Sequence, residues 1–233
     1  MVAKDPGSAF VRFALALPDV YEVGMSNLGL KILYGILNER TDTYAERAYC
    51  PWPDMEAVMR SGNDVLCSLE TRTPLKEFDA VGFSLQYEMT YTNILTMLDL
   101  GGIPLASSDR AECDPLVVGG GPCAFNPEPL ADFFDCFVIG EGEEVIGEIA
   151  AALAAWKQTG RSGGRPQLLV NLAKLSGVYV PSLYQVEYAA DGTCSGIKTR
   201  HADIPAMISK RVVADLDSAC FPVQPIVPSL ETV

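Results

Sequence analysis

Two glycine-ended runs decide the fold of this chain: Val117-Val118-Gly119-Gly120-Gly121-Pro122 and Val138-Ile139-Gly140-Glu141-Gly142-Glu143-Glu144. Each is a short apolar segment, typical of a buried strand, that ends where glycine lets the backbone turn sharply or approach a ligand. Ligands of open parallel sheets lie at the carboxyl ends of the strands, so the two runs predict a binding crevice. The alternative is that both are tight strand-to-helix turns that bind nothing.

Working outward, the same pattern recurs toward the N-terminus. Apolar runs at 11–17 and 80–85 join those at 115–119 and 136–140 as expected parallel strands, and segments with helical periodicity separate them. This alternation predicts an α/β fold, a doubly wound and mainly parallel sheet of flavodoxin-like order, over residues 1–160. Residues 161–233 begin with a Gly/Pro-rich linker and contain a hairpin signal at Asp191-Gly192, which predicts a small α+β appendage.

Composition excludes several classes of function. A formal net charge of −13 argues against a nucleic-acid partner, because phosphate backbones are bound by basic surfaces. No segment approaches the ~20 apolar residues of a membrane span, and the N-terminus lacks the pattern of a signal peptide. The seven cysteines contain no C-x-x-C pair and are expected to be reduced thiols in a cytoplasmic protein, without a metal site of their own.

In a flavodoxin-like order the loops after the first and third strands flank the crevice. Those loops carry Asp19, Tyr21 and Ser84 as hydrogen-bonding side chains, while Gly24 and Gly119–Gly121 offer bare backbone amides. The absence of a nearby Lys or Arg makes this rim poor for a free phosphate and better suited to an amphipathic ring system. Alternatively, Asp19 caps the following helix and Tyr21 has a packing role.

These positions also carry a resemblance to a known family. The D-x-Y-x-x-G of residues 19–24, Ser84-Leu85 and Gly119-Gly120 resemble the three signature positions of cobalamin-binding domains. The run at 138–143 is similar to one that recurs where such domains precede a radical S-adenosylmethionine (SAM) barrel. Longer phrases resemble the N-terminal region of a family of large bacterial radical SAM fusion proteins: PDVYEVGMSNLGL at 18–30, GFSLQYE at 82–88 and GGGPCAFNPEPLAD at 119–132.

The resemblance covers essentially the whole chain and implies a function for a larger parent protein. That parent would cleave SAM with a [4Fe–4S] cluster bound by a C-x-x-x-C-x-x-C motif, which is expected beyond Val233. The chain itself is then an accessory domain, not catalytic alone, whose partners are the barrel of the same polypeptide and an unknown substrate. By resemblance, the cofactor-binding positions are Asp19, Tyr21, Gly24, Ser84, Gly119, Gly120, Gly140 and Gly142.

One departure from the family pattern bears on cobalamin. Tyr21 stands where many cobalamin domains have a histidine ligand, and a phenol, protonated at neutral pH, is a poor ligand for cobalt. Either a corrinoid binds without that axial ligand, its nucleotide tail held by Ser84 and Gly119–Gly120, or the domain no longer binds cobalamin. The loss of the ligand slightly favours the second hypothesis.

Two further function classes remain as alternatives. The first is a degenerate Rossmann-like module that recognises a substrate or a partner without cobalamin. The second is a hydrolase with Ser84 or Cys123 as nucleophile. It is the weaker hypothesis because neither residue lies in a G-x-S-x-G elbow and His201, the single histidine, lies in the appendage.

Overall fold

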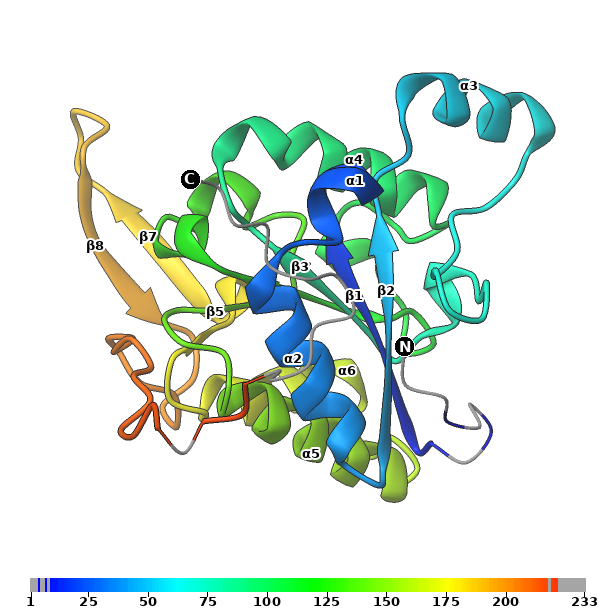
Figure 1. Ribbon diagram of the computed structural model, residues 1–233. Coiled ribbons are helices and arrows are strands. Elements are labelled where there is room, and N and C mark those ends of the chain that lie inside the picture. The colour runs from blue at the N-terminus through cyan, green and yellow to red at the C-terminus, as the bar shows by residue number, and fades with distance from the viewer. Residues whose placement is uncertain (1–3, 5–6, 8, 218, 222–233) are drawn as a thin grey trace, which may run out of the picture.

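A six-stranded sheet forms the centre of the molecule (Figure 1). A computed structural model describes residues 4, 7, 9–217 and 219–221. The strands are β1 (Val11–Leu17), β2 (Thr43–Tyr49), β3 (Ala80–Ser84), β4 (Leu116–Gly120), β5 (Cys136–Val138) and β6 (Val178–Tyr179). Their order is β2-β1-β3-β4-β5-β6, and β5 and β6 are antiparallel while the other pairs are parallel. The predicted α/β sheet of flavodoxin-like order is confirmed.

Helices cover the sheet as the right-handed crossover rule requires. They are α1 (Tyr21–Gly24), α2 (Leu28–Glu39), α3 (Pro53–Gly62), α4 (Tyr91–Leu100), α5 (Val145–Gln158) and α6 (Gly164–Ala173). Contacts join α2 to α5 and α5 to α6, and Figure 1 shows these three helices side by side. The crossover through α2 runs from β1 to one side and the crossover through α4 runs toward the other, which places α2 and α4 on opposite faces.

The sheet is buried because its strands are apolar on both faces. In β1, every residue except Arg12 is buried. Leu15, Gly82 and Val118 lie in register on neighbouring strands, so they share one face of the sheet. The helix α2 that packs over this face is capped by Asn27, whose side-chain oxygen accepts a hydrogen bond from the backbone N–H of Leu30 at 2.8 Å.

The chain beyond α5 adds elements to both the sheet and the appendage. Helix α6 packs on α5, and β6 pairs with β5 at the edge of the sheet. A 3₁₀ turn at Pro181–Leu183 then separates β6 from β7 (Tyr184–Tyr188). The Asp191-Gly192 turn joins β7 to β8 (Cys194–Thr199) in the predicted hairpin, which projects away from the sheet in Figure 1.

Short 3₁₀ turns occupy several loops: Leu75–Glu77, Glu88–Thr90, Ser107–Asp109, Pro122–Phe125 and Glu128–Leu130. Two of these follow the glycine-rich end of β4, where Pro122 starts the first of them. Within the described residues, no helix is both long enough and apolar enough to span a membrane.

Candidate functional site

The predicted crevice corresponds to a cavity of about 290 Å³ at the carboxyl ends of β3, β4 and β5, which we call the main cavity. Its floor is Leu15, Gly82, Val118 and Val138 from the sheet. Its walls come from α2, from the loops after β3 and β4, and from the segment that leads into α5: Gly29, Leu30, Ile32, Leu33, Ser84, Gln86, Gly119–Pro122, Gly140–Glu143, Val145 and Ile146. Five of the eight predicted site residues therefore line one cavity.

Gly120 is the glycine of the main cavity with the most open surroundings. A Cβ built on it would have Val138 Cβ as its nearest neighbour, at 3.9 Å, and its φ is not positive. At Gly142 a Cβ would lie 3.3 Å from Leu33 Cδ2, at the opposite wall. Neither position needs glycine to satisfy the backbone, so at Gly120 the missing side chain leaves space that belongs to the cavity.

The other two glycines are required by the protein's own packing. A Cβ on Gly119 would lie 2.7 Å from the Phe137 ring, on the far face of the sheet. Gly140 has φ +106°, and a Cβ there would lie 2.2 Å from the carbonyl oxygen of Arg211. For these positions the structural alternative, a tight contact without a ligand, explains the glycine.

Asp19 lies next to the main cavity, in a second hollow of about 250 Å³ that shares Ser84 and Gln86 with it. We call this hollow the rim cavity. The Asp19 carboxylate accepts hydrogen bonds from the Val20 backbone N–H at 2.7 Å and from the Tyr87 hydroxyl at 3.4 Å. Its negative charge raises the pKa of Tyr87, which keeps that phenol neutral and able to donate.

Tyr21 and Gly24 line neither of these cavities. The Tyr21 ring stands edge-on against Tyr49, with centroids 5.4 Å apart, and lines a separate hollow at the end of β2. Gly24 is buried beneath it, and a Cβ there would lie 2.4 Å from the Tyr49 ring. The D-x-Y-x-x-G run thus contributes Asp19 to the rim cavity, while its tyrosine and glycine pack on β2.

The charged groups of the main cavity are acidic, since Glu141 and Glu143 line it and no Lys or Arg does. The Glu141 carboxylate accepts a hydrogen bond from the backbone N–H of Val213, and Arg211 forms ion pairs with Glu144 and Glu148 at 2.8 and 2.6 Å. Residues 211–213 therefore brace the wall formed by Gly140–Glu144. This brace was absent from the sequence prediction, because only the fold brings position 211 next to 140.

The family that the sequence resembles suggests two cofactors, an iron–sulfur cluster and a corrinoid, and the residues of this chain do not suit both equally. Within the described part of the chain, no group of three or more His, Cys, Asp or Glu side chains could hold a metal ion. Burial raises the pKa of the Cys50 thiol to about 11 and that of Cys136 still further, which disfavours the thiolate form that iron requires. An iron–sulfur cluster therefore does not fit these residues.

For a corrinoid the fit is partial. Apolar walls and the open position at Gly120 would accept the ring end of a nucleotide tail. Tyr21 lies outside the main cavity, and the acidic lining opposes a phosphate. The hydrolase hypothesis gains no support either: burial, together with Glu88, raises the pKa of the Cys123 thiol, and His201 is exposed and lines none of the three cavities described above.

Comparison with known proteins relates the chain to one protein family and to a longer relative. Residues 29–181 match the family described as radical SAM proteins, N-terminal. A relative, the uncharacterized protein MJ0966 of Methanocaldococcus jannaschii, is 29% identical over 133 residues, which cover 56% of this chain and 24% of that protein. The chain thus spans about a quarter of the length of the curated relative that it matches.

Two solved structures are similar at low identity. One is the cobalamin-dependent SAM radical enzyme OxsB, solved with aqua-cobalamin and SAM bound, with 13% identity, a TM-score of 0.46, and coverage of 87% of this chain and 23% of that one. The other is the radical SAM methyltransferase TsrM from Kitasatospora setae, solved with tryptophan and a SAM analogue, with 18% identity, a TM-score of 0.42, and coverage of 78% and 29%.

Proposed function

Because this chain belongs to the family of N-terminal domains of radical SAM proteins, we propose that it is the accessory domain of such a protein and binds the apolar end of a small-molecule ligand in its main cavity. The ligand is either the substrate of the radical SAM domain or a corrinoid. The chain supplies binding and orientation, and the cluster and SAM belong to the radical SAM domain.

The observation that carries this proposal is the main cavity itself. It lies at the carboxyl ends of the parallel strands, where ligands of this fold class bind, and its walls are mostly aliphatic. Ser84 and Gln86, at the boundary with the rim cavity, can fix the orientation of a bound ring through hydrogen bonds. Asp19 and the Tyr87 hydroxyl extend this polar edge.

A test uses 5,6-dimethylbenzimidazole, the ring system of the cobalamin tail, as an apolar bicyclic probe. Ligand-observed NMR on the 233-residue chain should detect its binding. Gly120→Leu should weaken binding at least tenfold, because the new side chain occupies the cavity where a Cβ now has open space. Gly196→Leu is the matched control, since nothing lies within 4 Å of a Cβ at that hairpin position. Binding that survives Gly120→Leu would contradict the proposed site.

The cobalamin branch needs its own experiment. With Tyr21 facing the end of β2 and acidic groups lining the main cavity, we expect hydroxocobalamin to bind weakly or not at all. Gel filtration after mixing, followed by the absorbance retained with the protein, measures this. Tight stoichiometric retention that is lost in Gly120→Leu would instead establish a corrinoid as the ligand. Weak retention together with binding of the apolar probe favours the recognition-module alternative.

A further inference from the structure

A third hollow, which we call the edge cavity, lies away from the main cavity at the carboxyl end of β2. It has a volume of about 400 Å³. Its walls come from α1, from the start of α3 and from the loop between α3 and β3, and its lining includes Tyr21, Tyr49, Trp52, Met55, Leu69 and Arg72. Nothing in the proposed function uses this hollow.

Three large apolar side chains around the edge cavity are exposed together. Trp52 is 55% exposed, Met55 54% and Tyr21 44%, and exposed apolar side chains grouped around a hollow can mark a ligand-binding site. Tyr21 stands edge-on against the buried Tyr49, which fixes the orientation of its ring. Flat aromatic faces around a hollow of this size suit a planar aromatic ligand.

Two charged residues line the edge cavity, and only one of them is engaged. Glu22 accepts a hydrogen bond from the indole N–H of Trp52 at 3.3 Å. The guanidinium of Arg72 has no hydrogen bond or ion pair to any of the residues that the structure describes. Arginine pairs with carboxylates through two parallel hydrogen bonds, so an unpaired arginine at the lip of an aromatic hollow favours an anionic ligand.

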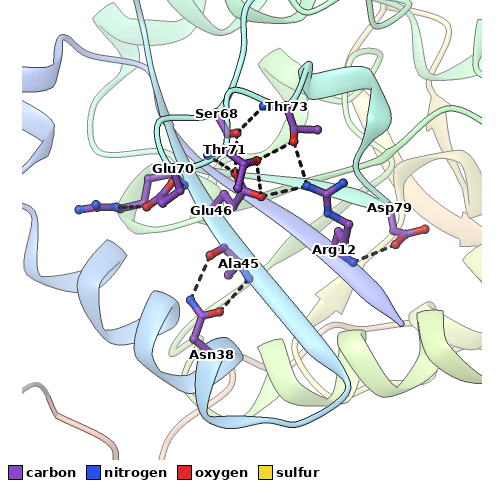
Figure 2. Close-up of polar contacts among 10 residues, drawn as sticks. Arg12, Asn38, Ala45, Glu46, Ser68, Glu70, Thr71, Thr73 and Asp79 are labelled. Atoms are coloured by element: carbon purple, nitrogen blue, oxygen red, sulfur yellow. Dashed lines mark hydrogen bonds and ion pairs between the residues drawn. The ribbon is translucent and has the colours of Figure 1, made fainter. Parts of the chain in front are cut away.

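The backbone of Arg72 has an unfavourable conformation, which its neighbours in the loop hold in place. Arg72 has φ 58°, in the left-handed region that residues with a Cβ rarely adopt. Its neighbours on both sides belong to a hydrogen-bond network around the fully buried carboxylate of Glu46, Thr71 directly and Thr73 through Arg12 and Ser68 (Figure 2). The Thr71 backbone N–H and hydroxyl both donate to Glu46, while Arg12 bridges Glu46 Oε1 at 2.9 Å and the Thr73 hydroxyl at 3.0 Å.

Two further hydrogen bonds, both made by the Ser68 hydroxyl, complete this network beneath the loop. The Ser68 hydroxyl donates to Glu46 at 2.6 Å and accepts from the Thr73 backbone N–H at 3.0 Å. The loop is therefore anchored from inside the protein at 68, 71 and 73 (Figure 2). The intervening Arg72 is exposed and lines the edge cavity. We propose that the edge cavity binds a small aromatic carboxylate, with the ring against Trp52 and Tyr21 and the carboxylate on Arg72.

The two tryptophans of the chain make this testable. Trp52 lines the edge cavity and Trp156 is buried on α5, so ¹⁵N-labelled indole groups give one reporter and one internal control. Trp52→Phe assigns the two signals. Titration with 1-naphthoate should shift the Trp52 signal saturably and leave the Trp156 signal in place. The equally sized cation 1-naphthylmethylammonium should bind with at least tenfold lower affinity, as measured by the shift of the Trp52 signal.

Substitutions of Arg72 distinguish its contribution to naphthoate binding from that of the aromatic walls. Arg72→Asn keeps a residue that tolerates the left-handed region and should weaken naphthoate binding at least tenfold. Arg72→Gly, which suits this φ without strain, is the second variant and should do the same. Arg200→Asn removes an equal charge from an exposed position outside the edge cavity and should leave binding unchanged.

Several outcomes would overturn the proposal: no saturable shift of the Trp52 signal, an affinity for the cation equal to that for naphthoate, or an affinity for naphthoate in both Arg72 variants equal to that of the wild type. Gly120→Leu distinguishes this site from the main cavity. It should weaken binding of the benzimidazole probe there at least tenfold and leave the naphthoate-induced shift of Trp52 unaltered, so either site can fail without the other.

Discussion

Glycines that look equivalent in the sequence have different physical roles. Gly24 is buried where a Cβ would lie 2.4 Å from the Tyr49 ring and 2.8 Å from Leu17, whereas a Cβ on Gly120 would meet no atom closer than 3.9 Å. Gly24→Ala should therefore lower the free energy of unfolding by about 1–3 kcal/mol, as overpacking does. Gly120→Ala should change it by less than about 0.5 kcal/mol.

Urea denaturation followed by circular dichroism measures both changes. Equal destabilisation by the two substitutions would contradict the packing role assigned to Gly24. The comparison also tests the assignment of Gly120 to the main cavity, because alanine there should reduce binding of the apolar probe without unfolding the chain.

The Cys50 thiol makes the free energy of unfolding depend on pH in the alkaline range. Burial, with the nearby acids Glu56 and Asp19, raises the pKa of its thiol to about 11, above the ~8.5 of an unfolded chain. A group whose pKa is raised by folding contributes its full stability below the unfolded pKa and loses it as the pH rises toward the folded one. Wild type should thus lose stability between about pH 8.5 and 11, by at most about 1.4 kcal/mol per pH unit from this group.

Cys50→Ala isolates that contribution, because other buried groups, such as Tyr44 with its pKa raised to about 12, titrate equally in both proteins. The difference in unfolding free energy between wild type and variant should be constant below pH 8 and shrink above pH 9. A difference that stays constant to pH 11 would show that the thiol ionises alike in the folded and unfolded states.

At the scale of elements, a buried ion network joins Asp135, the residue before β5, to α6. Asp135, whose side chain is 1% exposed, pairs with Arg110 at 2.9 Å and with Arg165 of α6 at 2.7 Å, and it also accepts the Val117 backbone N–H of β4. Asp135→Asn should cost about 3–5 kcal/mol, because it leaves two buried guanidinium groups without their counter-charge.

The matched control is Asp99→Asn, which breaks an exposed pair with Arg60 at 2.6 Å. It should cost less than about 1 kcal/mol, because solvent screens such a pair. Thermal unfolding of the two variants measures the contrast. Similar losses would mean that the network around Asp135 is solvated and does not fix α6 to the sheet.

The strands were predictable from the sequence because parallel strands buried on both faces are continuous apolar runs. The expected runs at 11–17 and 80–85 differ from β1 and β3 by at most one residue. Ser84, Gly120 and Gly142 were predictable for the main cavity because strand order determines where strand ends meet. Asp19 also lies at this end of the sheet, in the adjoining rim cavity.

Other features depend on contacts that local patterns do not encode. Tyr21 faces β2 because α1 packs against Tyr49, and the brace at Arg211–Val213 joins positions about seventy residues apart in sequence. The buried Glu46 is a carboxylate, a residue type that is almost never fully buried unless it is paired, so the sequence alone does not predict its burial. Its partners lie in a loop whose conformation follows from the network itself.

At the scale of the whole molecule, the proposed function assigns ligand binding to this domain and radical chemistry to another part of the protein. The family name places it at the N-terminus of radical SAM proteins, and the chain spans 24% of the length of its relative MJ0966. Such a division of labour requires that the cluster and SAM be bound elsewhere in the protein. Cys50 and Cys136 are buried, whereas Cys113 is exposed in the turn before β4 and Cys194 is exposed on β8.

We therefore expect that anaerobic reconstitution of the 233-residue chain with iron and sulfide yields no cluster and that equilibrium dialysis detects no SAM binding. Iron–sulfur clusters need several thiolates in one place, and no described group of side chains provides them. Iron and sulfide analysis and the absorbance near ~400 nm are the measurements, with a protein that carries a C-x-x-x-C-x-x-C motif as positive control. Stoichiometric iron in the chain alone would place part of the radical chemistry within this domain and would require its cysteines to rearrange from their positions in the fold.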